Sequence, residues 1–245
     1  MSSAKEVTFQ SGDLSLHATL VLPRHQKHSF PGVILFHGMT SSEKSYSALA
    51  SSLAEIGIAG LAVTMRGHGE SEGDFNKATV AEAINDGLAA YNFLATQPGI
   101  DASRIGMVGG SVGAIIAAMT STHRHVQSLI LRAPAAYTDY MMHITMAQTM
   151  VNEGKQFHEI DNLEATPAGK AITKFTGSLL VAASENDIVI PLNLSEGYID
   201  IAKQAKKKQL TIIKGADHAL KDPNLKEKFN HMALDWFTNT LLESK

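Results

Sequence analysis

A serine in a tight glycine pattern is the leading candidate for chemistry in this chain. Residues 109–113 read Gly-Gly-Ser-Val-Gly, which fits the pattern G-x-S-x-G. An apolar run precedes the pattern and a run of small and apolar residues follows it, which predicts a strand, a sharp turn and a helix. On such a turn the hydroxyl of Ser111 is exposed at the end of a sheet, and the helix N-terminus favours negative charge beside it. Ser111 is therefore a candidate nucleophile.

A carboxylic acid and a histidine follow later apolar runs. Asp187 comes shortly after the run at 179–183, and His218 comes shortly after the run at 210–213. If these runs are strands of a parallel sheet, they end at one edge, where open α/β sheets bind ligands. Taken alone, the glycine pattern also fits a connection whose serine only caps a helix. The acid and the histidine favour the interpretation as a nucleophile.

Each of these side chains has a role that serine chemistry needs. A serine hydroxyl is a poor nucleophile until a base takes its proton, and His218 is the candidate base. Asp187 would hold the imidazole in the right tautomer and stabilise its charged form. Glu185 is a rival for the role of the acid. Asp217 is a weaker choice, because neighbouring side chains point apart in most backbones.

Apolar runs and helical periodicity alternate along the chain. A hairpin is predicted at 7–22, around a Gly-Asp turn. Continuous apolar runs predict strands buried on both faces at 32–36, 58–63, 105–108, 128–131, 179–182 and 210–213. Helical spacing predicts helices at 46–56, at 80–94, after the candidate nucleophile, at 194–206 and at 225–242. The alternation predicts an α/β fold, with one mostly parallel sheet and helices on both faces, in a single domain over 1–245.

The alternation breaks once, between the strands predicted at 128–131 and 179–182. No strand is evident in 137–176, which is too long for an ordinary loop, so we expect an insertion that covers Ser111. Its methionines have helical spacing and either line an adaptable apolar pocket or pack the insertion onto the core: Met142, Met146 and Met150. The candidates for polar substrate contacts are Tyr140, His143 and Gln148.

Several short motifs carry a resemblance to a known family. They are His-Gly-Met-Thr at 37–40, Arg-Gly-His-Gly-Glu-Ser at 66–71, Gly-Gly-Ser-Val-Gly at 109–113, Arg-Ala-Pro-Ala-Ala at 132–136, Asp-Ile-Val-Ile-Pro at 187–191 and Gly-Ala-Asp-His at 215–218. With them the chain resembles, over nearly its whole length, the α/β-hydrolase superfamily, and within it the small bacterial carboxylesterases that include cinnamoyl and feruloyl esterases. The resemblance implies the α/β-hydrolase fold, with an eight-stranded, mostly parallel sheet and a small cap insertion at about 137–176.

The fold also implies where the negative charge of a tetrahedral intermediate is held. The donors are the backbone N–H groups of Val112, directly after the nucleophile, and of Met39, in the loop after the 32–36 strand. One such donor is worth about 3 kcal/mol of transition-state stabilisation. His37 and His68 are interpreted as residues that brace loops rather than as bases. Thr64 stands where family members often have Asp, two residues before the arginine of the second motif.

Composition excludes several classes of function. The chain has 245 residues, a net charge of −3 and no cysteine. Without a basic stripe or a basic amphipathic helix, neither nucleic acid nor a membrane surface is an expected partner. Without cysteine there is no disulfide, zinc–thiolate site or cysteine nucleophile. We expect a cytoplasmic protein without cofactor or catalytic metal, and no signal indicates an oligomeric state. The lysine run at 206–208 is expected to be a solvated helix end.

The residues and the resemblance lead to one functional hypothesis. The chain is expected to be a serine esterase that cleaves small to medium carboxylic esters, with an apolar or aromatic acyl group, through an acyl-enzyme on Ser111. A serine peptidase of the prolyl-oligopeptidase type is the nearest alternative. It would need acids to anchor an amino terminus, for which Glu153, Glu159 and Asp161 are candidates. A thioesterase and a non-catalytic binding module are the remaining alternatives.

Overall fold

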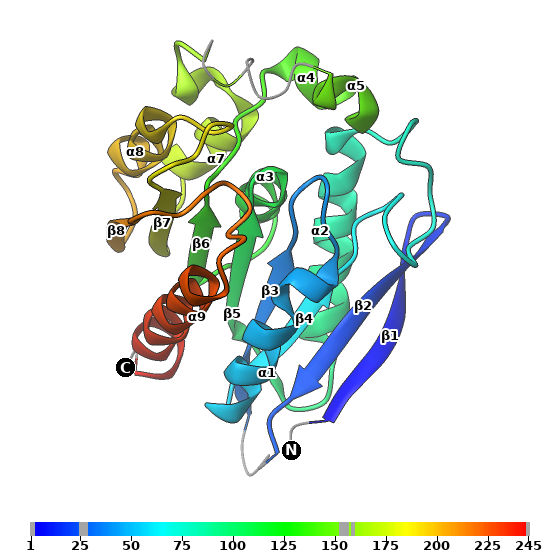
Figure 1. Cartoon of the computed structure of the whole chain (residues 1–245). Coiled ribbons are helices and arrows are strands. Elements are labelled where there is room, and N and C mark those ends of the chain that lie inside the picture. The colour runs from blue at the N-terminus through cyan, green and yellow to red at the C-terminus, as the bar shows by residue number, and fades with distance from the viewer. Residues whose placement is uncertain (1–2, 25–28, 152–156, 158–159, 244–245) are drawn as a thin grey trace.

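The structure is a computed structural model, and it describes residues 3–24, 29–151, 157 and 160–243. Its centre is an eight-stranded sheet in the order β1-β2-β4-β3-β5-β6-β7-β8, shown in Figure 1. Strand β2 runs antiparallel to both of its neighbours, β1 and β4, and all the pairings from β4 to β8 are parallel. The strands are β1 (Ser3–Ser11), β2 (Leu14–Leu22), β3 (Phe30–Phe36), β4 (Ala59–Val63), β5 (Ile100–Gly110), β6 (Ser128–Arg132), β7 (Ser178–Ser184) and β8 (Lys207–Ile213). The predicted fold class is confirmed.

Helices cover both faces of the sheet and make two apolar cores. One face carries α1 (Ser47–Glu55) and α9 (Pro223–Phe237), with a π-helical turn at Thr238–Leu242 after it. The other face carries α2 (Val80–Ala95), α3 (Val112–Thr120), α7 (Pro167–Thr173) and α8 (Leu192–Ile201). Strand β3 supplies both cores: Ile34 and Phe36 face the second group of helices, and Val33 and Leu35 face the first. A strand buried on both faces reads as a continuous apolar run, which is why these strands are visible in the sequence.

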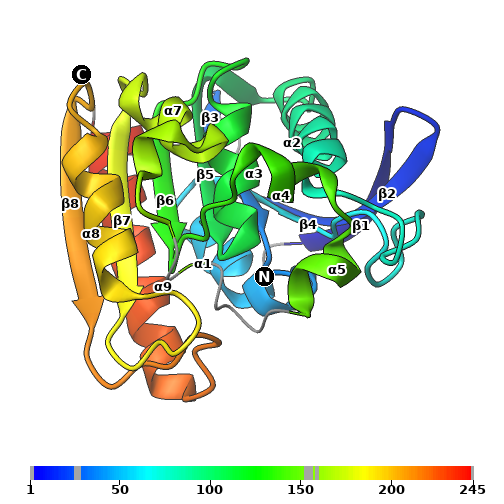
Figure 2. The ribbon, with the colours of Figure 1, turned by 90° about the horizontal axis from the view of Figure 1, so that it is seen from above.

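The segment between β6 and β7 consists of short helices in the part that the structure describes. They are α4 (Asp139–His143), α5 (Met146–Met150), the 3-10 turn η2 (Leu163–Ala165) and α7. The methionines at helical spacing do not share one helix, because the chain turns at Ile144, which has an extended backbone, and Thr145 then caps α5. The Thr145 side chain accepts from the Gln148 backbone, and the Gln148 side chain accepts from the Thr145 backbone. Seen from above in Figure 2, α4 and α5 lie over the carboxyl ends of the central strands.

The lysine run at 206–208 does not end a helix, which corrects the expectation. Helix α8 already ends at Ile201, and Lys207 and Lys208 begin β8, an edge strand of the sheet. Lys208 donates to the Ile199 carbonyl, and the Lys207 ammonium lies 5.0 Å from the centre of the Trp236 ring. Lysines on an edge strand oppose pairing with another sheet, and this supplies a reason for the run. Within the described residues, no helix is both long and apolar enough to cross a bilayer.

Candidate active site

Ser111 lies on a strained turn between β5 and α3. Its backbone has φ 52° and ψ −116°, a region that a non-glycine residue rarely adopts. Glycines on either side let the strand and the helix approach: a Cβ added at Gly109 would lie 2.5 Å from the Cα of Ala114, and one at Gly113 would lie 2.7 Å from the His37 carbonyl oxygen. The turn predicted from the glycine pattern is therefore formed, with Ser111 at the carboxyl end of the sheet.

Asp187 and His218 are joined by a hydrogen bond. The His218 Nδ1–H donates to Oδ2 of Asp187 over 2.8 Å, while Oδ1 of Asp187 accepts from the N–H groups of Val189 and Ile190. Burial alone raises the pKa of Asp187, but the hydrogen bond and charge of His218 and the two backbone donors lower it overall. The carboxylate is thus ionised at neutral pH and aimed at the imidazole.

The rival acids have other partners. Glu185 accepts a hydrogen bond from the Gly215 backbone over 2.8 Å. Asp217 accepts from the Lys221 backbone and lies 4.0 Å from the Lys221 ammonium. Neither carboxylate is within hydrogen-bond distance of His218 among the described contacts, so the geometry favours Asp187 over both.

Ser111 and His218 line one cavity of about 540 Å³. No hydrogen bond joins the Ser111 hydroxyl to the His218 ring among the described residues, which is common before a substrate is bound. The Ser111 side chain is mostly buried, with 7% of the residue exposed, and 23% of the His218 side chain is exposed. Solvent and small molecules can thus reach both the His218 imidazole and the Ser111 side chain from the cavity.

The loop after β3 lies against the nucleophile. A Cβ added at Gly38 would lie 3.4 Å from Cβ of Ser111, so this stretch of backbone passes directly beside the serine. Met39 and Val112 both line the cavity. In the described part of the chain, their backbone N–H groups donate to no protein acceptor. Two unused backbone donors beside a serine have the character of an oxyanion hole.

Two histidines hold that loop in place. The His37 Nδ1–H donates to the Gly38 carbonyl over 2.7 Å, and His37 Nε2 accepts from the Met65 backbone over 3.1 Å. Burial lowers the pKa of His37 to about 4, so its ring is neutral at pH 7. His68 places Nε2 2.6 Å from the Met39 carbonyl and Nδ1 2.9 Å from the Arg66 carbonyl. Both rings contact backbone around the candidate oxyanion hole.

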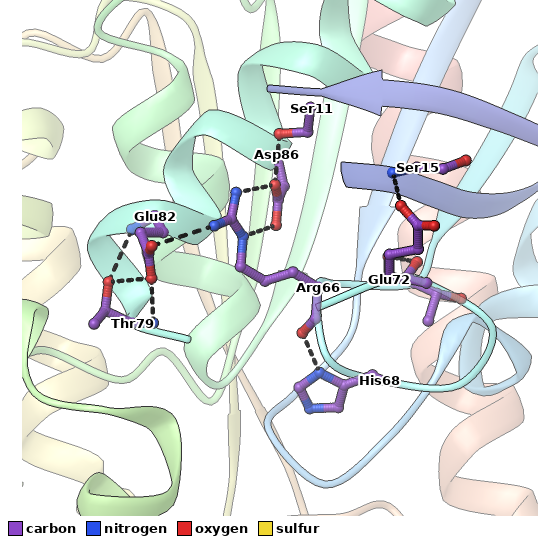
Figure 3. Close-up of polar contacts among 10 residues, drawn as sticks. Ser11, Ser15, Arg66, His68, Glu72, Thr79, Glu82 and Asp86 are labelled. Carbon is purple, nitrogen blue, oxygen red and sulfur yellow. Dashed lines mark hydrogen bonds and ion pairs between the residues drawn. The ribbon is translucent and has the colours of Figure 1, made fainter. Parts of the chain in front are cut away.

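The loop that carries His68 is anchored by a buried ion pair, drawn in Figure 3. Arg66 donates from Nε and Nη2 to the two carboxylate oxygens of Asp86 in α2, over 2.8 and 2.7 Å. The Ser11 hydroxyl at the end of β1 donates to the same carboxylate, and Glu82 lies 3.7 Å from the guanidinium. The hydrogen bonds from Arg66 to Asp86 are the main cause that raises the pKa of Arg66, so this cation stays charged. The loop, α2 and β1 are thereby held together.

Thr64 has its own partner in this region. Its hydroxyl donates to Oε2 of Glu43, a buried carboxylate of the 3-10 turn η1 (Glu43–Tyr46). The Ser71 hydroxyl donates to the Thr64 carbonyl and accepts from the His17 backbone. The Thr64 hydroxyl thus meets an acid from another element, and this contact supports the loop.

Residues 28–162 match the model of a hydrolase family described as serine aminopeptidase, S33, and the match covers more than half of the chain. The chain belongs to this family of α/β hydrolases. An uncharacterized protein of Mycobacterium tuberculosis, Rv2307c, is 24% identical over 225 residues, which are 92% of this chain and 75% of that protein.

Solved structures share the fold of this hydrolase. Est1E from Butyrivibrio proteoclasticus, with ferulic acid bound, has a TM-score of 0.75 at 19% identity, covering 97% of this chain and 100% of that chain. The Pyrococcus furiosus esterase PF2001 has a TM-score of 0.74 at 18% identity, covering 98% and 92%. At these identities the likeness establishes the α/β-hydrolase fold alone.

The wall of the hydrolase cavity differs from the one expected from the sequence. Tyr140 is 74% exposed, and Met142 and Met146 are buried in the apolar core, so the structure places none of the three in the cavity wall. The described residues that line the cavity under the segment between β6 and β7 are instead Tyr137, Thr149, Met150 and Phe157. The Tyr137 and Phe157 rings are stacked, with centres 5.7 Å apart. Of the methionines at helical spacing, Met150 thus lines the cavity, whereas that spacing gave no signal for Tyr137, Thr149 or Phe157.

Arg132 is a cavity residue that the sequence analysis used only as part of a motif. It ends β6, and its carbonyl accepts from the Ser111 backbone over 2.9 Å. Its side chain lines the cavity and donates from Nη1 to the His218 carbonyl over 2.5 Å. Its position next to the nucleophile follows from the pairing of β6 with β5, a long-range contact that local sequence does not reveal.

Proposed function

We propose that this hydrolase is a serine esterase that cleaves carboxylic esters of small to medium size. Ser111 is the nucleophile, His218 the general base and acid, and Asp187 the residue that orients His218. The observation that carries the proposal is the Asp187–His218 hydrogen bond of 2.8 Å in a cavity that also exposes a serine on a strained turn.

The reaction has two displacement steps at one carbonyl carbon. His218 Nε2 takes the hydroxyl proton as Oγ of Ser111 bonds to the ester carbon, and the N–H groups of Met39 and Val112 bind the resulting oxyanion. The C–O bond to the alcohol then breaks, and His218 gives its proton to the leaving oxygen. A water molecule, deprotonated by His218, attacks the acyl-enzyme, and collapse of the second tetrahedral intermediate releases the carboxylic acid and free Ser111.

The family name favours a second candidate, an aminopeptidase. Such an enzyme must hold the positive amino terminus of a peptide, which requires acidic groups at the cavity. The cavity wall, as far as the described residues form it, contains Arg132 and Lys226 and no carboxylate. Asp161 is exposed and is not part of the wall, while Glu153 and Glu159 lie outside the described residues. This charge pattern supports esters over aminoacyl substrates.

Labelling with a fluorophosphonate tests the nucleophile. The probe should modify Ser111, located by mass spectrometry of the digested protein, and the Ser111→Ala variant should stay unlabelled. A label on another serine, or none on wild-type protein, contradicts the assignment.

Paired substrates test the reaction class. A p-nitrophenyl ester should be turned over at least about a hundredfold faster, by kcat/KM, than an alanyl p-nitroanilide. Turnover of the ester should vanish in Ser111→Ala, which also excludes a non-catalytic binding protein. Faster turnover of the anilide would instead support the peptidase, and faster turnover of an acyl thioester than of the matched oxygen ester would support a thioesterase. We further propose that the protein acts on a small-molecule ester and binds neither nucleic acid nor a membrane.

A further inference from the structure

The cavity has two ends with different chemistry. One end is formed by the segment between β6 and β7 and the loop after β7, and its wall is mostly apolar and aromatic. The other end lies between η1 and α9, and its wall includes Tyr46, Arg132, Lys226 and Asn230. Tyr137 and Phe157 belong to the core on one face of the sheet and Tyr46 to the core on the other, so the ends lie on opposite sides of the nucleophile turn. A substrate that fills the cavity therefore meets apolar wall at one end and cationic wall at the other.

Arg132 is a buried cation without a carboxylate partner among the described residues. Only 8% of the residue is exposed, yet its named partners are the His218 carbonyl and the Tyr46 hydroxyl, both neutral. The other buried arginine, Arg66, has a bidentate pairing with an aspartate. A guanidinium carries five N–H donors, so the two neutral partners leave donors unused. A buried charge without a counter-ion is costly, and a bound anion would remove that cost.

Space and charge around Arg132 both suit an anion. Gly110 leaves room for the group, because a Cβ there would lie 2.7 Å from the Tyr46 hydroxyl and 3.4 Å from Nε of Arg132. Lys226, in the second turn of α9, lines the same end, and no ion pair with a described acid involves it. The protein as a whole is negative, with a net charge of −3, so the cationic wall is a local feature and not a consequence of overall composition.

We propose that Arg132, assisted by Lys226, binds a carboxylate of the substrate, so that this enzyme selects esters that carry a negative charge. A carboxylate matches the planar fork of a guanidinium and can accept two of its N–H groups. The apolar end of the cavity takes the hydrocarbon or aromatic part of the same molecule. This inference rests on the proposed esterase function, because it assigns the substrate class of that site.

Charge selectivity is measured with matched ester pairs. One pair has the charge on the alcohol side, 4-acetoxybenzoate against its methyl ester, and the other has it on the acyl side, mono-4-nitrophenyl glutarate against 4-nitrophenyl methyl glutarate. We expect kcat/KM of wild-type enzyme to favour the charged member at least about tenfold in one pair. Overall protein charge would favour the neutral members. Preference for the neutral ester in both pairs overturns the inference while leaving the esterase function intact.

Variants separate charge recognition from support of the His218 loop. In Arg132→Gln the charged-to-neutral ratio should fall to about one, and in Arg132→Lys it should lie between wild type and Arg132→Gln. The matched control is Arg104→Gln, which removes an arginine paired with Asp101 outside the cavity and should leave the ratio unchanged. If Arg132→Gln slows both esters equally, the residue only supports the loop and the inference is wrong. If Arg132→Gln does not fold, the charged-to-neutral ratio is measured in Lys226→Gln and in wild-type enzyme at high salt, and we expect it to fall in both. An unchanged ratio in both contradicts the inference.

A binding measurement keeps the test independent of catalysis. Saturation-transfer NMR with wild-type protein should detect benzoate more strongly than benzamide, and Arg132→Gln should abolish the difference. Equal signals for the two ligands would refute the anion site even if no ester were hydrolysed, whereas hydrolysis that fails beside a clear benzoate preference would reject only the esterase function.

Discussion

At the scale of single residues, the two oxygens of the Asp187 carboxylate have different tasks. One accepts from the backbone of Val189 and Ile190 and thereby holds the side chain still, and the other accepts from His218. Glu185 lies two residues earlier and is bound to the Gly215 backbone instead. A carboxylate that is locked from one side can fix the tautomer and direction of the imidazole on its other side.

We predict that Asp187→Asn lowers kcat for a p-nitrophenyl ester by about 10³- to 10⁴-fold with little change in KM, because the imidazole is then held in the wrong tautomer. Glu185→Gln is the control and should change kcat less than about threefold. Steady-state kinetics on both variants, with circular dichroism to verify folding, measure the effect. Equal losses in the two variants would mean that Asp187 is not the orienting acid.

The neutral, buried His37 gives a prediction for stability against pH. Its pKa falls from 6.5 to about 4 on folding, so between these values the unfolded chain binds more protons at this residue than the folded chain does. Stability from this source is therefore complete above about pH 6.5 and is lost as pH falls towards 4, by up to about 3 kcal/mol. Urea unfolding of wild type and His37→Gln at pH 7 and pH 4.5 should show a smaller acid loss in the variant. An identical loss in both would contradict the assignment.

At the scale of elements, the loop after β3 depends on partners from outside itself. His37 Nε2 accepts a hydrogen bond from the Met65 backbone N–H, and His68, on the loop after β4, contacts the Met39 carbonyl. The two loops follow neighbouring parallel strands, and this pairing brings them together at the carboxyl end of the sheet. The Met39 N–H shares its peptide plane with the Gly38 carbonyl, which His37 holds, and the contact of His68 with the Met39 carbonyl fixes the peptide that follows.

We predict that His68→Leu lowers kcat about tenfold, because the peptide after Met39 loses its partner and the backbone on both sides of the Met39 Cα, including its N–H, is then held less firmly towards the oxyanion. Met39→Ala keeps the backbone donor and should retain kcat within about threefold while changing KM through the cavity wall. Comparison of kcat and KM for both variants on one ester is the test. A larger loss of kcat in Met39→Ala than in His68→Leu would reject this account of the loop.

At the scale of the whole molecule, the site lies between two apolar cores that the sheet separates. The nucleophile turn contacts both cores, since Val112 belongs to one and Tyr46, beside Gly110, belongs to the other. The ion pair of Arg66 and Asp86 fastens the loop of His68 to α2 and, through Ser11, to β1 at the edge of the sheet (Figure 3). Stability of the hydrolase scaffold and order of the site are thus supported by the same contacts.

We predict that Asp86→Ala lowers the free energy of unfolding by about 3 kcal/mol or more, since it leaves the buried Arg66 without its bidentate partner and with only the half-exposed Glu82 nearby. Asp101→Ala removes the partner of Arg104 in a pair that is about a quarter exposed on each side, and should cost about 1 kcal/mol or less. Denaturant unfolding of the two variants gives the comparison. Similar losses of unfolding free energy in the two variants would mean that burial does not strengthen the contribution of the Arg66–Asp86 pair to stability.

Much of the fold and the chemistry of the candidate site could be read from the sequence, because both depend on local patterns. Strands buried on both faces appear as continuous apolar runs, and the strained turn of Ser111 needs small residues at fixed spacing. These patterns gave the strand and helix alternation, the hairpin at the N-terminus and the family resemblance, all of which agree with the structure. The roles of Ser111, Asp187 and His218 stay predictions that the proposed experiments address.

Only the tertiary structure decided matters that depend on residues far apart in the chain. Which acid faces His218 depends on how the loops after β7 and β8 fold against each other, and the sequence, although it favours Asp187, leaves Glu185 as a rival. The cavity wall depends on how α5 packs, because Met150 lines the cavity while Met146, four residues earlier in the same helix, lies in the core. The charge of the cavity rests on Arg132 having no acid within reach among the described residues, and the absence of a counter-ion is a property of three-dimensional packing that no local pattern encodes.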